Sequence, residues 1–164
     1  GWKRQRLAET GIAVPDGLTF APVNFETETL AQGLARAGFD NTKPAVFAWL
    51  GVVPYLTHDA IMATLRFIAG LPKGTTVIFD YGEPASTRHE ASRIAHEEMA
   101  ARVAANGEPF RSFFPLEDIM RDVTSAGFSE VEDFNSQMLN ARSFRDRDDG
   151  LELRGAGHLL RARV

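Results

Sequence analysis

One stretch of this 164-residue chain, PAVFAWLGVVPYLTHD at residues 44–59, constrains the fold more than any other. Its apolar run at residues 45–50 is too short for a helix and is bounded by Pro44 and Gly51. A run of this kind predicts a parallel strand that is covered on both faces, at the centre of an α/β sheet. Ligands bind beyond the carboxyl ends of such strands, so we expect a site at residues 50–55.

The residues after this strand predict a helix and a second strand. Thr57 is placed to cap the helix, and Asp59 lies in its first turn. Gly74 leads into the sequence TTVIFDY at residues 75–81, which predicts another buried strand. A strand, a helix and a strand in this order predict a right-handed crossover between parallel strands.

The remaining elements follow from apolar spacing and from turn residues. Thr87 and Glu90 fit a capping box, which predicts a long helix ending at Gly107, with Ala91, Ile94, Ala95, Met99 and Val103 facing inward. Other helices are predicted at residues 3–10, 27–37, 115–127 and 136–144, and other strands at residues 18–25, 128–134 and 158–164. The class is α/β with a mainly parallel sheet whose last two strands pair antiparallel.

Composition excludes several functions. The net charge of −4 and a pI near 5.6, without a basic stripe, argue against nucleic-acid binding. The chain has no cysteine, which excludes thiolate catalysis and cysteine-based zinc sites. It contains no apolar run of membrane-spanning length and no signal-peptide pattern, so we expect a cytoplasmic protein without a membrane partner.

Familiar catalytic motifs are also missing. His89 and His96 are each followed by glutamate but lie seven residues apart, so no H-E-x-x-H zinc face forms and no metal site is predicted. His58 and His158 have no partner that the sequence identifies. There is no G-x-S-x-G elbow, no G-x-G-x-x-G turn and no phosphate-binding loop within these residues.

Two residues beyond the predicted strands could carry chemistry. Asp80 ends the second strand, where it could serve either as an acid in the site or as a cap of the next turn. Tyr55 follows the first strand, and its phenol could donate a hydrogen bond to a substrate oxygen. A tyrosine packed in the core is the alternative for Tyr55.

The run FAWLGVVPYLTHDAIMATLRFIAGLPKGTTVIFDY resembles the leucine carboxyl methyltransferase family, in particular its bacterial O-methyltransferases related to polyketide-tailoring enzymes. The flanking pieces WKRQRLAETGI, FAPVNFETETLAQGLARAGFD, NGEPFRSFF, AGFSEVEDF and FRDRDDGLELRGAGHLLRARV resemble that family in the same order. The resemblance covers essentially the whole chain.

The resemblance implies a class I (Rossmann-like) methyltransferase sheet with the strand order 3-2-1-4-5-7-6. It further implies that residues 1–164 form the C-terminal portion of one such domain, with N-terminal strands one and two missing. The glycine-rich loop and the acidic residue that grip the methionine and ribose of S-adenosylmethionine would lie outside these residues. The expected partner is therefore a missing N-terminal half across the open sheet, or a second copy of the chain.

The resemblance also implies which residues meet the cofactor and the acceptor. Asn24 and Phe25 occupy the family's adenine-binding position, where the usual residue is Asp, and an amide can make the same hydrogen bonds. Leu50 precedes Gly51 where the family often has Glu, which removes a charge from the cofactor contact. Tyr55 occupies the family's tyrosine position and is the predicted catalytic or substrate contact.

Two functions from different classes follow. The first is an S-adenosylmethionine-dependent O-methyltransferase that acts on a carboxylate or hydroxyl of a small molecule, and whose isolated 164 residues are inactive. The alternative is a non-catalytic remnant or interaction fragment that keeps the fold without binding the cofactor. A dinucleotide dehydrogenase is a weaker third reading, because it requires a G-x-G-x-x-G turn upstream.

Overall fold

The computed structural model describes residues 1–24, 27–88 and 90–164, together with the backbone but not the side chain of Ala91. The chain divides into two compact units, residues 1–40 and residues 41–164, which are described separately. Among the described residues no helix is long and apolar enough to cross a membrane.

The first unit holds two short helices, α1 (Trp2–Glu9) and α2 (Leu30–Arg36). Gly11 follows α1 with a φ of 68°, the conformation that glycine commonly adopts just after a helix. Helix α2 begins later than predicted because Thr29 and Gln32 form a reciprocal capping box at its start. It ends in a Schellman motif, in which Gly38 has a φ of 82° and Phe39 N donates to Leu34 O at 3.0 Å.

The strand predicted at residues 18–25 is wrong for its described part, since residues 18–24 are irregular and pair with none of the described strands. Pro22 has no N–H to give to a ladder, and its carbonyl accepts a hydrogen bond from Arg36 Nη2 at 2.7 Å. The Val23 side chain packs tightly against Gly33, where a Cβ would lie 2.2 Å from Val23 Cγ2. Phe25 lies outside the described residues.

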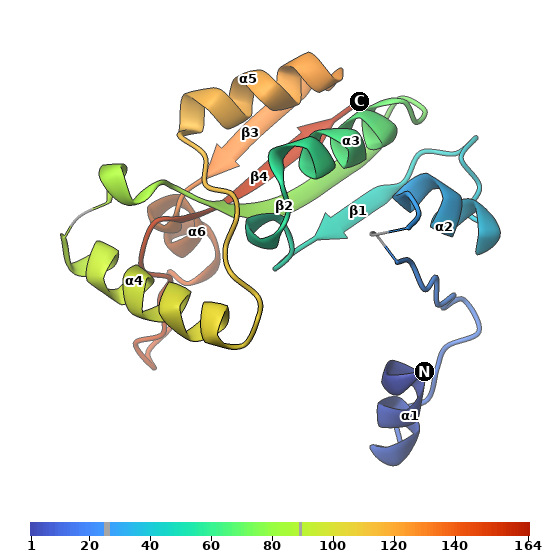
Figure 1. Ribbon diagram of the computed structural model, residues 1–164, viewed down its shortest axis with the longest axis horizontal. Coiled ribbons are helices and arrows are strands. Elements are labelled where there is room, and N and C mark those ends of the chain that lie inside the picture. Colours follow the sequence, from blue (N-terminus) through green and yellow to red (C-terminus); the bar gives the residue numbers. More distant parts are fainter. Residues whose placement is uncertain (25–26, 89) are drawn as a thin grey trace. The chain divides into compact units, whose positions relative to one another are not determined.

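The second unit is built on a four-stranded sheet in the order β1-β2-β4-β3 (Figure 1). The strands are β1 (Val46–Trp49), β2 (Thr76–Gly82), β3 (Glu130–Phe134) and β4 (Gly157–Arg163). β1 pairs parallel to β2, whereas β4 runs antiparallel to both β2 and β3. The predicted crossover and the antiparallel final strand are confirmed.

The core lies between one face of this sheet and two helices, α3 (His58–Ala69) and α5 (Leu116–Ala126), which lie side by side (Figure 1). Phe79 pairs with Leu160 and Val77 with Ala162, so one row of buried side chains crosses β2 and β4. The helices contribute the buried residues Ile61, Leu65, Ile68, Ile119 and Val123. One face of α3 is therefore buried against the sheet.

β1 is covered less than predicted. Its burial alternates, with Phe47 and Trp49 packed against the core and Val46 75% exposed on the other face. β1 lies at the edge of the described sheet, and α3 and α5 contribute the buried residues that face only one side of it. A continuous apolar run cannot distinguish a strand covered on both faces from an edge strand covered on one.

Two short 3₁₀ helices, η1 (Val53–Tyr55) and η2 (Ala85–Thr87), follow β1 and β2 respectively. The capping box predicted at Thr87 is wrong, because helix α4 (Glu90–Ala105) begins at Glu90 and the Thr87 hydroxyl donates to Pro84 O at 2.9 Å. Residue 89, which directly precedes α4, lies outside the described part of the chain.

The inward face predicted for α4 is also wrong in part. Ile94 is 47% exposed and Met99 is 54% exposed, and Ala95 is exposed as well. The sequence of α4 carries small and charged residues around its whole circumference, so apolar spacing alone did not specify one face. The last helix, α6 (Ser136–Ser143), is capped by the Asn135 side chain.

The buried position of Leu65 gives a stability prediction. Because its side chain is fully buried between α3 and the sheet, Leu65→Ala should lower the free energy of unfolding by about 2–5 kcal/mol in urea denaturation. Ala63→Ser, on the exposed side of the same helix, should change it by no more than about 0.5 kcal/mol. Equal effects of the two variants would contradict this placement of the core.

The two threonines predicted as caps should now behave differently. Thr57 caps α3, since its hydroxyl accepts from Ala60 N, and Thr57→Ala should cost about 0.5–2 kcal/mol. Thr87→Ala removes only an exposed hydroxyl outside α4 and should cost less than about 0.5 kcal/mol. A larger urea-midpoint shift for Thr87→Ala than for Thr57→Ala would restore Thr87 as a helix cap.

Candidate functional site

A hydrogen bond fixes the loop at the carboxyl ends of the two parallel strands. Gly51 N, two residues after the end of β1, donates to Asp80 Oδ1 of β2 at 2.6 Å. Gly51 adopts a φ of 71°, a conformation that favours glycine, and the position of an added Cβ would meet no atom within 4 Å. Asp80 therefore holds the neighbouring loop, a contact that the sequence did not predict, and it also lines the second cavity described below.

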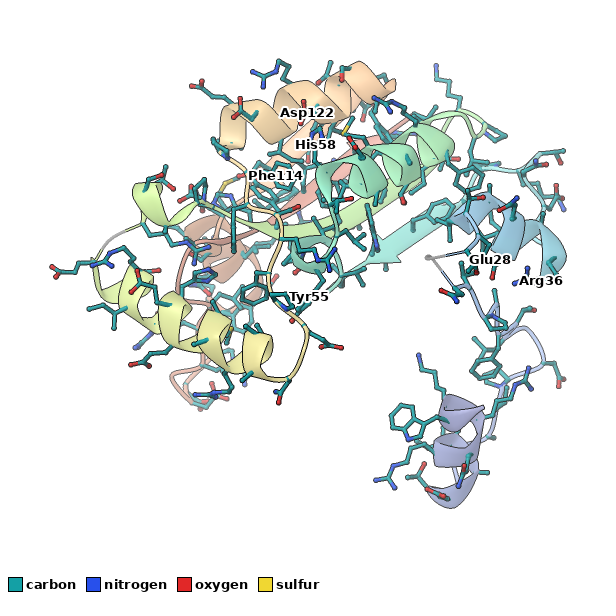
Figure 2. All side chains as sticks on the ribbon, in the orientation of Figure 1. Glu28, Arg36, Tyr55, His58, Phe114 and Asp122 are labelled. Carbon is teal, nitrogen blue, oxygen red and sulfur yellow. The ribbon has the colours of Figure 1, made fainter. Side chains whose placement is uncertain are left out.

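Tyr55 lies in η1, directly after this loop, and is half-buried (Figure 2). Its ring lies 5.3 Å from the ring of Phe110, and its hydroxyl has no hydrogen-bond partner among the described residues. It lines a cavity of about 500 Å³ together with Gly51, Val52, Gly107, Glu108, Pro109 and Arg111. The structure thus brings two predicted site residues, Gly51 and Tyr55, to one cavity.

A second cavity, of about 320 Å³, opens at the carboxyl end of β2 beside α4. Its walls come from Asp80, Tyr81 and Gly82, from one face of α4, and from the segments around Phe110 and Ala156. The Phe110 ring lines this second cavity, and it lies 5.3 Å from the Tyr55 ring of the first cavity and 5.5 Å from the His96 ring.

Arg88 is one of the two arginines, with Arg154, that line this second cavity. Its Nε and Nη2 both donate to the backbone oxygen of Glu83, at 2.8 and 2.5 Å, and its guanidinium lies over the Phe113 ring. Partial burial lowers the pKa of Arg88, and the charge of Glu83 opposes this shift. A guanidinium remains charged at neutral pH despite such a shift.

His96 lines the same cavity from α4. Its ring stacks on Phe110 at an interplanar angle of 13° and meets the edge of Phe113 at 5.0 Å. Burial, and then the charge of Arg88, lower the pKa of His96 below its ordinary value of 6.5, whereas Glu97 opposes the shift. The imidazole is accordingly neutral at pH 7.

A cluster of polar side chains connects β2, β3 and β4. The Tyr81 hydroxyl donates to Asp133 Oδ1 at 2.7 Å, and His158 contacts Asp133 Oδ2 at 2.8 Å through Nδ1 and Glu83 Oε1 at 3.3 Å through Nε2. Burial, and then the hydrogen bond to Asp133, raise the pKa of Tyr81 far above its ordinary value of 10. This phenol therefore stays protonated and serves as a structural donor.

His58 also has a partner that the sequence did not reveal. Figure 2 shows His58 of α3 next to Asp122 of α5, and Nε2 lies 2.8 Å from Asp122 Oδ2. The His58 ring also lies 6.0 Å from the ring of Phe114. Asp122 lies 64 residues away in sequence, so no local pattern could have identified this pair.

The residues predicted to meet the cofactor fall in both units. Asn24 belongs to residues 1–40, where its backbone N–H donates to Glu28 Oε1 at 3.0 Å. The hydrogen bond from Arg36, followed by that from Asn24, lowers the pKa of Glu28 to about 2 (Figure 2). Leu50 and Gly51 belong to residues 41–164, and Leu50 is 54% exposed. Phe25 lies outside the described residues.

No group of three or more metal-ligating side chains occurs among the described residues.

Comparison with known proteins gives matches of three kinds. The sequence profile of the leucine carboxyl methyltransferase family matches residues 1–69. A Bacillus subtilis (strain 168) protein described as "Putative S-adenosyl-L-methionine-dependent methyltransferase YktD" is 28% identical over 163 residues, which cover 98% of this chain and 53% of that protein. The chain thus spans about half the length of this curated relative.

Solved structures show weaker likenesses. A protein from Bordetella parapertussis has a TM-score of 0.48 at 16% identity, covering 82% of this chain and 47% of that one. A Thermotoga maritima protein described as a "SAM-dependent methyltransferase, possible histamine N-methyltransferase" has a TM-score of 0.46 at 15% identity, covering 82% and 68%.

The strand order is β1-β2-β4-β3, and β4 runs antiparallel to its neighbours. This arrangement corresponds to strands 4-5-7-6, the last four in the order 3-2-1-4-5-7-6 of a class I methyltransferase sheet. The class is therefore a Rossmann-like α/β fold of the methyltransferase type with an open sheet. Over residues 1–69 the chain is similar to the leucine carboxyl methyltransferase family.

The bond between Asp80 and Gly51 can be tested directly. Asp80→Ala removes the acceptor, so the Gly51 amide should exchange with solvent at least about tenfold faster in hydrogen-exchange NMR. Asp59→Ala, an exposed carboxylate in the first turn of α3, is the matched control and should leave the Gly51 amide unchanged. Unaltered exchange in Asp80→Ala would mean that another contact holds the loop.

Proposed function

We propose that this chain forms the acceptor-binding part of an S-adenosylmethionine-dependent O-methyltransferase that methylates a carboxylate or hydroxyl of a small molecule. The match of residues 1–69 to the leucine carboxyl methyltransferase family and the likeness to YktD support the reaction class. The single observation that carries the proposal is the pair of cavities at the carboxyl ends of β1 and β2. This edge of an open parallel sheet is where ligands bind in α/β proteins.

The residues near Gly51 fit an approaching cofactor. The open space beside Gly51 admits a ligand where a side chain would intrude, and the exposed Leu50 side chain offers an apolar surface next to it. When bound, S-adenosylmethionine supplies an electrophilic methyl group. By resemblance Asn24 and Phe25 would contact its adenine, and the residues that grip its methionine end would lie outside these 164 residues.

The side chains of the two cavities would bind and orient the acceptor. Tyr55 lines the first cavity, and its hydroxyl has no hydrogen-bond partner among the described residues. The hydroxyl can therefore donate a hydrogen bond to an acceptor oxygen. Methyl transfer is an in-line displacement that depends mainly on positioning, and Phe110 and Tyr55 restrict where a planar acceptor can lie. The rigid loop fixed by Asp80 keeps η1 and Tyr55 in place.

The non-catalytic alternative has one observation in its favour, namely Leu50 in place of the acid that the family often carries there. Isothermal titration separates the two functions when it is done on the protein that carries this chain and on the 164 residues alone. A methyltransferase should bind S-adenosylmethionine in the first case and negligibly in the second. Absence of binding in both cases would favour the non-catalytic fragment.

Tyr55→Phe tests the proposed role of the phenol. In the protein that carries this chain, the variant should lower methyl transfer to its acceptor by about tenfold to a thousandfold, because a positioned donor is lost. Its urea midpoint should not change, whereas that of Tyr81→Phe should fall, since only the Tyr81 hydroxyl has a structural partner. Unchanged turnover in Tyr55→Phe would return Tyr55 to a packing role.

A further inference from the structure

The histidines with described side chains differ in what holds their ring nitrogens. His58 is bound through Nε2 by Asp122, and His158 is held through both nitrogens by Asp133 and Glu83. Within the part of the chain that the structure describes, neither ring nitrogen of His96 has a hydrogen-bond partner. His96 is instead held by its ring faces and edges, through Phe110 and Phe113.

His96 lies where its two unbonded ring nitrogens could contact a ligand. The residue lines the second cavity, and the aromatic contacts fix the plane of its ring without using a nitrogen. A neutral imidazole in this state carries one nitrogen that can accept a proton. Apolar and aromatic side chains, those of Ala95, Met99, Phe110 and Phe113, line the same cavity and suit a planar apolar ligand.

Arg88 is the second feature of this wall. Among the described residues its hydrogen bonds go to the backbone oxygen of Glu83, and no carboxylate lies within ion-pair distance of it. A partly buried guanidinium without an ion-pair partner is suited to a negatively charged ligand atom. The charged or titratable groups that face His96 or line this cavity are Asp80, Tyr81, Arg88, Glu97 and Arg154.

We propose that this cavity binds an acceptor with a planar ring that carries a weakly acidic hydroxyl of the phenol type, with His96 as the proton acceptor and Arg88 facing the resulting oxyanion. The proposal rests on the proposed function and names its substrate class. The O–H bond breaks, a new N–H bond forms on the imidazole, and the electron pair remains on the oxygen, which becomes the nucleophile. The step needs no oxidant or reductant.

The chemistry of the cavity favours a hydroxyl over a carboxylate. A carboxylate is already ionised at pH 7 and needs no base, whereas a phenol with a pKa near 10 does. The burial and the Arg88 charge that keep His96 neutral at pH 7 leave it able to accept a proton. Because the pKa of His96 is lowered, this capacity should be present at neutral pH and be lost as the pH falls below 6.5 through the lowered pKa.

The test uses para-nitrophenol, whose phenolate absorbs at a longer wavelength than the phenol, as a probe bound to the 164-residue chain. Binding should lower the ionisation midpoint of the probe by about one pH unit or more, because one unit corresponds to a tenfold preference for the phenolate. His96→Phe keeps the aromatic stack but lacks the nitrogens, and it should abolish most of this shift. Arg88→Met should weaken binding at pH 7 by about tenfold.

Two controls keep the result specific. His58→Gln removes an imidazole outside the cavity and should leave the shift and the affinity unchanged. The methyl ether para-nitroanisole has no proton to give, so its affinity should be the same for the original chain and for His96→Phe. Circular dichroism of each variant confirms that it is folded.

Several outcomes would overturn the proposal. These are the absence of para-nitrophenol binding at millimolar concentration, an unchanged ionisation midpoint on binding, an equal shift in His96→Phe, and tighter binding of para-nitrobenzoate than of para-nitrophenol. In the protein that carries this chain, methyl transfer to para-nitrobenzoate but not to para-nitrophenol would keep the proposed function and reject the phenol acceptor. Phenol binding through His96 without any methyl transfer would support this site and reject the proposed function.

Discussion

The alternation of β2 is the constraint on which the rest of residues 41–164 depends. Successive residues of a strand point to opposite faces, so burying Val77, Phe79 and Tyr81 against α3 and α5 necessarily places Asp80 on the other side. There Asp80 accepts a hydrogen bond from Gly51, the second residue after β1, and fixes the loop that leads to Tyr55. A shift of one residue in the register of β2 would bury the Asp80 carboxylate and expose Phe79. The same register therefore determines both the core packing and the position of the loop.

The sequence predicted the elements whose evidence is local. The strands at β1 and β2 and the cap at Thr57 rest on residues within a few positions of one another, and the structure confirms them. The cover of β1 was mispredicted because an apolar run does not show which neighbours are present. Thr87 failed as a cap because it ends the 3₁₀ helix η2, and α4 begins three residues later at Glu90.

The candidate site could be predicted only in part, because its walls come from distant segments. Tyr55 and Gly51 were found from their place after a strand, which is a local signal. The contact of Tyr55 with Phe110, the partners of His58 and His158, and the cavity beside His96 and Arg88 depend on tertiary contacts between residues tens of positions apart. His96 was considered only as a metal ligand, since its spacing to other histidines was the one pattern that the sequence displayed.

Phe110 lines the second cavity and packs against Tyr55, which lines the first. Its side chain belongs to the irregular segment before α5. The size of molecule that fits the second cavity therefore depends on a rotatable ring on a loop as well as on the strands and α4. Related chains could acquire larger or smaller substrates by changing this one residue, while the sheet and its core stay as they are.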